Sequence, residues 1–315
     1  MKKILLPLLS IILISSVSFG QRNYFPSNLL PNSTIRIVGF RDTLINGKKQ
    51  WITTVGTGFV YEFEIDGMKL MTIVTNKHVV ENSSYDRFTF KKVDSNYKLG
   101  DVIKSDTLTI SKFNEQWIYH PSEDLAILLF DSIKNRFTKK YNKDILYTWF
   151  GKDIIPSYKD SIKISSIEKV LMVGYPKSLW DSTNNLPVIR QGLTATPFFS
   201  DFNGRKRFLI DIPTFHGSSG SPVLLYSFEP FWEDTLWVRS EFRTYLLGIA
   251  VESYTYDAYG KLMPYDPNTI ISDSLEKKYK LQMDIPLNIA IVIKAERLFD
   301  FDSLIKSYLQ KKRKK

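Results

Sequence analysis

Short hydrophobic runs recur along most of the chain, and segments rich in Asn, Asp, Gly and Pro separate them. This pattern predicts antiparallel β-strands rather than the alternating strands and helices of a parallel sheet. A first series of strands is expected at 34–39, 50–62, 68–75, 86–92, 106–118 and 124–130. A second series is expected at 168–174, 188–196, 207–212, 221–226, 242–252 and 289–294. The sequence therefore predicts an all-β fold of two antiparallel six-stranded β-barrels.

The segments between and after these series complete the predicted organisation. The first barrel is expected within residues 21–130 and the second within 167–294, joined by a polar, lysine-rich connection at 131–166. The amphipathic pattern of residues 295–310 predicts a C-terminal helix that packs on the second barrel. A basic tail follows at 311–315. An insertion from about Tyr254 to Met283, rich in Tyr, Asp and Lys, is expected to overhang the cleft between the barrels.

Residues 1–20 have the pattern of a signal peptide. Lys2 and Lys3 precede an apolar stretch at 4–19, and the small residues Ser18 and Gly20 suit a cleavage site before Gln21. An uncleaved anchor is the alternative, but Pro7 interrupts a stretch shorter than the roughly 20 apolar residues that a membrane span needs. We expect an exported protein, periplasmic or extracellular, with no transmembrane span after cleavage.

Composition narrows the classes of partner and cofactor. The net charge is +10, and five basic residues occupy the last five positions, so the basic character is expected mostly in the tail. Such a tail is usually solvated, with contact to an anionic surface as the alternative. Nucleic-acid binding has no other support. Since the chain has three histidines, no cysteine and no glycine-rich phosphate loop, we expect no metal and no cofactor.

Candidate chemistry is concentrated in Gly217-Ser218-Ser219-Gly220-Ser221-Pro222. A serine is a weak nucleophile at neutral pH and needs a general base together with backbone N–H groups that hold the oxyanion. Glycines on both sides of Ser219 allow the backbone to turn tightly and to approach a reacting carbonyl. The segment therefore predicts a nucleophilic serine.

His78 is the best candidate for the base, because an apolar strand ends just before it in Thr75-Asn76-Lys77-His78. Asp124, at the start of a buried strand, is the candidate that would orient the imidazole. The alternative for Asp124 is a turn or cap residue. His120 lies in a turn-like segment and is expected to be an ordinary loop histidine.

The order His78, Asp124, Ser219 resembles that of the chymotrypsin-fold, trypsin-like serine proteases. Further similarities, to the bacterial Deg-type and glutamyl-endopeptidase-like branches, lie in Gly56-Thr57-Gly58-Phe59, Asp124-Leu125-Ala126, Gly174-Tyr175-Pro176, Gly217 to Pro222, and Leu247-Gly248-Ile249-Ala250. Too few residues follow Leu298 for the peptide-binding (PDZ) domain of Deg-type proteases. The resemblance implies a secreted serine endopeptidase whose triad forms an acyl-enzyme, with the N–H groups of Gly217 and Ser219 as the oxyanion hole.

The sequence departs from animal trypsins at the site of zymogen activation. Ile37-Val38-Gly39 after Arg36 resembles a new N-terminus, but Ser218 replaces the aspartate that would pair with its ammonium. A buried, unpaired cation is unfavourable. We therefore expect residues 34–38 to form the first strand rather than a cleavage site.

Substrate specificity is the least determined property. The resemblance places the primary pocket near Thr214, His216, Val251, Glu252 and Ser253. Pro213 stands where trypsin has the acid that selects Lys and Arg, and the expectation is a small or apolar residue before the scissile bond. An acidic side chain held by His216 and Thr214 is the alternative.

Two other functions stay open. One is a trypsin-like scaffold used for binding without catalysis, and the other is a regulatory protease of one envelope partner. For a catalytic triad, the rate is expected to rise with pH through about 6.5–7, because only a neutral imidazole accepts the proton of the nucleophile.

Overall fold

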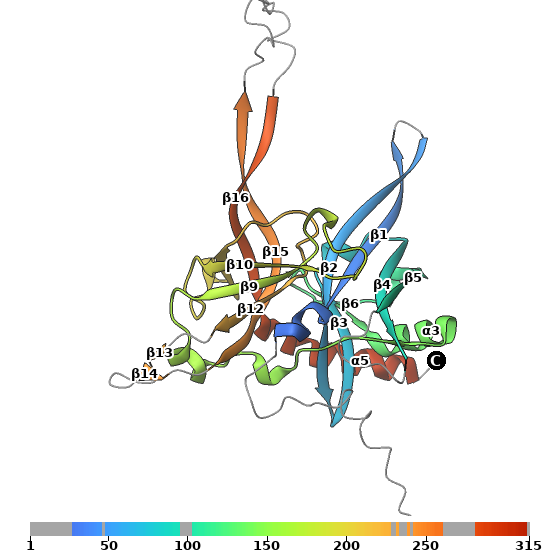
Figure 1. Ribbon diagram of the computed structural model, residues 1–315, viewed down its shortest axis with the longest axis horizontal. Helices are drawn as coiled ribbons and strands as arrows, with labels where there is room; N and C mark the ends of the chain where they lie inside the picture. The colour runs from blue at the N-terminus through green and yellow to red at the C-terminus, as the bar shows by residue number, and fades with distance from the viewer. Residues whose placement is uncertain are drawn as a thin grey trace, which may run out of the picture.

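The computed structural model describes residues 27–45, 48–94, 103–227, 231–232, 238–239, 242–260 and 281–313. Figure 1 shows a sheet built from the first half of the chain, a barrel built from the second half, and the C-terminal helix along the base. The predicted signal peptide and the last two residues of the basic tail lie outside the described residues.

The first half forms an antiparallel sheet in the order β5-β4-β1-β2-β3-β7-β6, with β8 paired to β4. All six predicted strands are present, and two strands of two residues add to them. The bounds are β1 Thr34–Ile45, β2 Lys48–Ile65, β3 Met68–Thr75, β4 Tyr85–Val93, β5 Lys104–Ser111, β6 Ile118–Tyr119, β7 Ala126–Leu129 and β8 Asp144–Ile145. Pairing among the described residues leaves this sheet with two ends, β5 and β6, so the first half is an eight-stranded sheet there and not the closed six-stranded barrel that the sequence predicts.

The second half is a closed antiparallel barrel in the order β10-β11-β16-β15-β12-β9, which confirms the predicted six-stranded barrel. Its strands are β9 Lys169–Gly174, β10 Val188–Thr194, β11 Arg207–Asp211, β12 Pro222–Ser227, β15 Arg243–Gly260 and β16 Leu281–Lys294. Two short strands, β13 Phe231–Trp232 and β14 Val238–Arg239, pair only with each other in the described part of the chain. The prediction of an all-β chain with a C-terminal helix is confirmed.

Helical segments occupy about half of the remaining described positions. They are η1 Ser27–Asn32, α2 Lys77–Val80, η2 Phe113–Gln116, α3 Phe130–Tyr141, η3 Lys152–Ile154, η4 Tyr158–Lys163, η5 Pro176–Ser178, η6 Phe202–Gly204, η7 Ala295–Asp300 and α5 Phe301–Arg313. Helix α3 falls in the segment expected as a polar connection. Its Ile133 and Phe137 are fully buried in the core of the first sheet, so this part of the connection is an amphipathic helix.

The C-terminal helix packs only in part as predicted. Segment η7 contacts β15 of the barrel, but α5 contacts β2 and β6 of the first sheet. The rings of Phe301 and Phe63 meet edge to face with centroids 6.3 Å apart, and Lys306 forms an ion pair with Asp66 at 2.6 Å. The expected packing on the second barrel is therefore confirmed for η7, the first part of the predicted helix, whereas α5 packs on the first sheet as well.

Three apolar clusters form the interior. One fills the first sheet and one fills the barrel. The third joins the two halves, since it contains Phe59 of β2, Leu224 of β12 and Ile305 of α5. Burial of this shared cluster fixes the two halves against each other, as the hydrophobic effect favours removal of its apolar surface from water.

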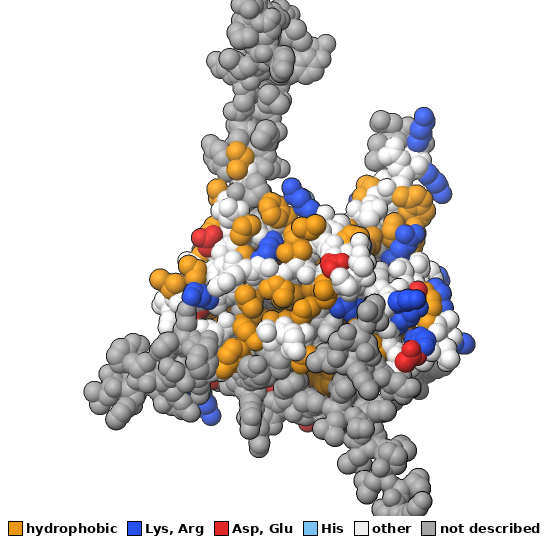
Figure 2. Space-filling model, viewed as in Figure 1, with side chains coloured by type: hydrophobic (Ala, Val, Ile, Leu, Met, Phe, Trp, Pro, Cys, Tyr) orange, Lys and Arg blue, Asp and Glu red, His pale blue; other side chains and the backbone are white. Residues whose placement is uncertain are grey.

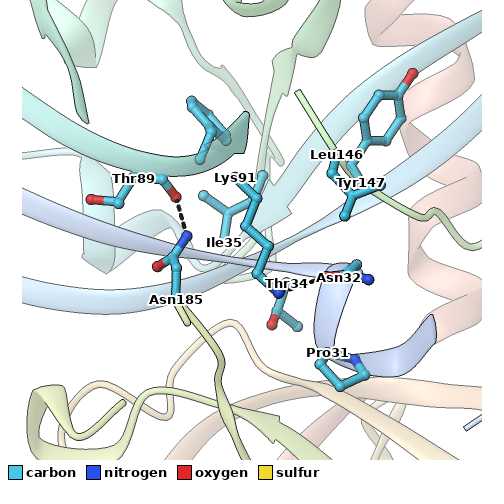
Figure 3. A pocket seen from close by; sticks show the side chains of 10 residues that line it. Pro31, Asn32, Thr34, Ile35, Thr89, Lys91, Leu146, Tyr147 and Asn185 are labelled. Atoms are coloured by element: carbon cyan, nitrogen blue, oxygen red, sulfur yellow. Dashed lines mark hydrogen bonds between the residues drawn. The ribbon is translucent and has the colours of Figure 1, made fainter. Parts of the chain in front are cut away.

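A small polar contact also joins the halves. Asn185, in the loop between β9 and β10, donates a hydrogen bond of 3.0 Å to the carbonyl of Thr89 in β4. Beside it, the buried Lys91 donates to Asn32 at 2.8 Å, and burial lowers the pKa of Lys91 to about 8. Figure 3 shows these side chains around a cavity of about 20 Å³, which is large enough for one water molecule.

The residues expected to overhang the cleft continue the barrel strands. Figure 1 shows β15 and β16 extending together beyond the barrel as a two-stranded ribbon. Ser253 and Thr255, at the base of this ribbon, line a cleft. The described part of the insertion therefore projects from the barrel and contributes Thr255 to the cleft lining, whereas residues 261–280 lie outside the described residues.

Positive charge is also present on the body of the protein. Figure 2 shows Lys and Arg side chains gathered over the β1–β2 hairpin and beside β4 and β5. Exposed basic residues in this region are Arg41, Lys48, Lys49, Arg87 and Lys104. Basic side chains therefore occur on the body as well as in the predicted tail, of which Lys311 to Arg313 continue α5. Among the described residues, no helix is both long enough and apolar enough to cross a bilayer.

Candidate active site

A cleft of about 810 Å³ contains the candidate catalytic residues. His78 and Asp124 come from the first half of the chain, whereas Ser219 comes from the second. The remaining lining residues are Lys177, Thr214, Phe215, His216, Val251, Ser253 and Thr255. The structure therefore brings together three residues that lie far apart in the sequence.

His78 and Asp124 are directly hydrogen bonded. The imidazole Nδ1 lies 2.5 Å from Asp124 Oδ2, and the backbone N–H of His78 donates to Asp124 Oδ1 at 2.9 Å. Both contacts follow from local structure, because α2 begins directly after β3 and Asp124 lies just before β7, the strand that pairs with β3. A carboxylate at Nδ1 favours the tautomer that leaves Nε2 free to accept a proton.

The electrostatic environment keeps Asp124 ionised. Its partial burial opposes ionisation, but hydrogen bonds and charge from His78, with the backbone N–H of Lys77, hold the pKa of this carboxyl below its usual range. A carboxylate that accepts several hydrogen bonds is stabilised in its charged form. Asp124 can therefore stabilise the positive charge that an imidazolium would carry.

The turn that carries Asp124 is anchored by residues that sequence analysis missed or gave no role. His120 is buried, accepts hydrogen bonds at Nδ1 from the N–H groups of Ser122 and Glu123, and contacts Asp300 through Nε2 at 3.0 Å. Arg207 of β11 donates to Glu123 at 2.8 Å. His120 therefore holds the turn in place and lies outside the cleft lining.

Ser219 lies on a turn that needs two glycines. Gly217 and Gly220 have φ angles of 92° and 85°, a region that side chains with a Cβ rarely adopt. A Cβ would lie 2.3 Å from the Tyr175 carbonyl oxygen at Gly217 and 1.9 Å from the Thr57 carbonyl oxygen at Gly220. The close approach of Thr57 and Tyr175 thus requires both glycines.

The turn leaves two backbone donors free. Ser218 N–H donates to the Phe215 carbonyl at 2.9 Å, whereas the N–H groups of Gly217 and Ser219 donate no hydrogen bond to any described residue. The two free N–H groups, on either side of the bonded N–H of Ser218, could stabilise an oxyanion. Gly217 and Ser219 are the residues that the sequence predicts for the oxyanion hole.

The hydroxyl of Ser219 points to the opposite wall of the cleft. Its Oγ donates to the Val251 carbonyl at 3.0 Å, and among the described residues it makes no hydrogen bond with His78. Ser219 is partly exposed in the cleft. Rotation about its Cα–Cβ bond is the movement that would turn the hydroxyl from Val251 to the imidazole.

Ser218 is fully buried and is hydrogen bonded to an arginine that belongs to none of the motifs found in the sequence. Arg190 of β10 donates to Ser218 Oγ at 2.8 Å and also to the Pro213 carbonyl. Burial lowers the pKa of Arg190 to about 10. The residue that precedes the candidate nucleophile is therefore held by a guanidinium from a neighbouring part of the barrel.

Residues 34–38 lie within β1, as predicted. They pair with β2, and Ile37 and Val38 are buried. The guanidinium of Arg36 lies 3.9 Å from the ring centre of Trp180. The segment that resembles an activation site is therefore an internal strand.

The candidate pocket residues have different positions. Thr214, His216, Val251 and Ser253 all line the cleft. The backbone of Glu252 pairs with Ile291 in β16, and its side chain lies outside the described residues. Lys177 lines the cleft too but was not expected, although Gly174-Tyr175-Pro176 directly precedes it.

The described residues contain no group of three His, Asp or Glu side chains that could hold a metal ion. The chemistry that this cleft can perform without such an ion is acid–base and nucleophilic. Comparison with models of known protein families and with curated proteins finds no match for this chain.

Proposed function

We propose that this protein is a serine endopeptidase of the chymotrypsin-like, trypsin-related type, which hydrolyses peptide bonds through an acyl-enzyme. The observation that carries the proposal is the hydrogen-bonded pair of His78 and Asp124 in the same cleft as Ser219. A base oriented by a carboxylate beside a serine is the arrangement that nucleophilic catalysis needs.

The first step forms the acyl-enzyme. Ser219 Oγ turns toward His78, gives its proton to Nε2 and attacks the substrate carbonyl carbon. The N–H groups of Gly217 and Ser219 hold the oxyanion, and each such donor is worth about 2.7–4 kcal/mol in measured cases. When the C–N bond breaks, the imidazolium returns the proton to the leaving amine.

The second step reverses these roles with water. His78 takes a proton from water, the hydroxide attacks the acyl carbon, and the bond to Ser219 Oγ breaks as the imidazolium returns the proton to the serine. Asp124 stays ionised throughout and stabilises the imidazolium.

The acyl half of the substrate can bind along β15. Pairing of β15 with β12 ends at Ile249, and the Val251 carbonyl points into the cleft. An extended peptide could add to this open edge by main-chain hydrogen bonds. The side chain before the scissile bond would meet Thr214 and Ser253, which suits a small or apolar residue.

Export through residues 1–20 belongs to the same proposal, since the sequence pattern supports it.

A non-catalytic binding scaffold is the main alternative function. The bonded His78–Asp124 pair and the two free N–H groups favour catalysis, because binding alone requires neither. A regulatory protease of one envelope partner would use the same chemistry.

Labelling with a fluorophosphonate tests the proposal. The mature protein should be labelled, whereas Ser219→Ala and His78→Ala should lose the label. Ser200→Ala, an exposed serine outside the cleft lining, is the matched control and should be labelled like the wild type. Equal labelling of wild type and Ser219→Ala, or no labelling of the folded wild type, would remove the catalytic assignment.

A further inference from the structure

The cleft has an excess of basic side chains. Lys177 and His216 line it, and the single acid in the described lining, Asp124, is hydrogen bonded to His78. The Lys177 side chain is exposed, its Nζ lies 4.9 Å from the ring centre of Phe215, and no ion pair with another described residue neutralises it. A substrate in this cleft therefore meets the positive charge of Lys177, while the charge of Asp124 is taken up by its hydrogen bonds with His78.

The position of Lys177 is fixed by its backbone. Its φ and ψ are 48° and 34°, and the next residue, Ser178, also has a positive φ of 61°. Residues without a glycine's freedom rarely adopt this region, and such strain gathers at functional sites. Lys177 N–H donates to the His216 carbonyl at 2.6 Å, which ties this turn to the segment before Ser219.

Lys177 and the substrate-binding edge of β15 lie on opposite sides of the nucleophile. Ser219 comes just before β12, and β12 lies between β9 and β15 in the barrel. Lys177 follows the end of β9, whereas Val251 and Ser253 belong to β15. If the acyl half pairs with β15, the leaving half extends toward Lys177.

We infer that Lys177 is a specificity-determining residue that selects an acidic side chain on the leaving-group side of the scissile bond. The inference rests on the proposed function, because only a peptide cleaved at Ser219 has a leaving group. His216 lies beside Lys177 and adds a second donor to the same side of the cleft.

The expected preference is modest. Exposed ion pairs contribute about 0.2–1 kcal/mol, which corresponds to at most about a fivefold change in kcat/KM. It should weaken with added salt, since exposed charges are screened. Charge reversal at Lys177 should invert the preference, because attraction is replaced by repulsion.

The experiment compares cleavage of matched peptides. Sites are first mapped by mass spectrometry in a peptide pool, and the preferred sequence is then made with Glu, Gln or Lys at each leaving-side position. Wild type should cleave the Glu peptide faster than the Gln peptide. Lys177→Met should lose this difference, and Lys177→Glu should prefer the Lys peptide. Met and Glu, like Lys, are unbranched at Cβ, so neither adds backbone strain.

Lys159→Glu is the matched control, since it changes the net charge equally at an exposed position outside the cleft lining. It should keep the wild-type ratio. Two outcomes would overturn the inference and leave the proposed function intact. In the first, the wild type is labelled by fluorophosphonate but cleaves peptides without an acidic preference. In the second, the ratio of Glu-peptide to Gln-peptide cleavage is unchanged in Lys177→Glu. Wild type that is neither labelled nor active would remove both.

Discussion

Arg190 donates a hydrogen bond of 2.8 Å to Oγ of the fully buried Ser218, the residue before the candidate nucleophile. The same guanidinium donates to the carbonyl of Pro213. Arg190 thereby holds both ends of the segment that leads into the turn of Ser219. Because Ser218 carries no charge, the turn is ordered by an internal arginine and needs no freed N-terminus.

Replacing Arg190 should disorder this turn. Arg190→Met should lower the rate of fluorophosphonate labelling by about 10- to 100-fold, since a misplacement of about 1 Å at a reacting group can cost about 100-fold. Arg190→Lys should not restore the rate, because an ammonium lacks the planar fork that reaches two acceptors. Labelling rates near the wild-type value in Arg190→Met would show that Arg190 does not position the turn.

Thr57 connects the first sheet to the nucleophile turn. Its Oγ1 donates to the Gly217 carbonyl at 2.8 Å and accepts from the N–H of Tyr175 at 3.2 Å, and its own N–H donates to the Ser219 carbonyl at 2.8 Å. The side chain is fully buried. Strand β2, which carries Thr57, is thus joined directly to the segment that carries Ser219.

Thr57→Val keeps the shape of this side chain but removes its hydroxyl. A buried carbonyl then loses its partner, which should lower the free energy of unfolding by about 1–3 kcal/mol. Urea denaturation measures this change, and labelling should slow in parallel. Thr57→Ser is the control, because it retains the hydroxyl. If Thr57→Ser is labelled no faster than Thr57→Val, the hydrogen bond to Gly217 does not determine the labelling rate.

Asp124→Asn tests the role of the carboxylate. The amide has nearly the same shape, but its NH₂ group can present a donor to Nδ1 of His78 and favour the wrong tautomer. The rate of peptide cleavage should fall by about 10⁴-fold while the thermal midpoint changes little. A fall of less than tenfold would argue that His78 does not need Asp124.

Asp86 gives a pH prediction away from the cleft. This residue of β4 is fully buried, and burial raises its pKa to about 8, against a smaller opposing effect of the Ser83 hydroxyl. An unfolded chain would have the carboxyl near its ordinary pKa of about 3.9. Between these two values the folded state holds a proton that the unfolded state has lost, so stability falls as pH rises.

Asp86→Asn should remove this loss, because the amide stays neutral at every pH. The variant should match the wild type at about pH 4, gain at most about 1.4 kcal/mol per pH unit above it, and show a constant advantage beyond about pH 8. Denaturation of both proteins across this range measures the difference. Asp42→Asn, an exposed acid, is the control; a pH-independent difference for Asp86→Asn would contradict the raised pKa.

The pattern of hydrophobic runs was sufficient to predict the strands and the closed second barrel. Side chains along a strand point alternately to the two faces of the sheet, and this alternation is visible in the sequence as a regular spacing of apolar residues. It did not predict helix α3, since Ile133 and Phe137 are spaced among lysines in a segment that has the composition of a connection. It also assigned the whole C-terminal helix to the second barrel and missed that α5 packs on the first sheet, because an amphipathic face shows that a helix packs but not on which surface.

For the candidate site too, some features follow from the sequence and others only from the tertiary structure. The sequence by itself determined the residue types and order of His78, Asp124 and Ser219, together with the two glycines, since their chemistry and backbone requirements are local. Only the tertiary structure decided that Arg190 pairs with Ser218, that Thr57 holds Gly217, and that Lys177 faces the cleft. These contacts join strands that are distant in sequence, and no local pattern of residues records which strands will become neighbours.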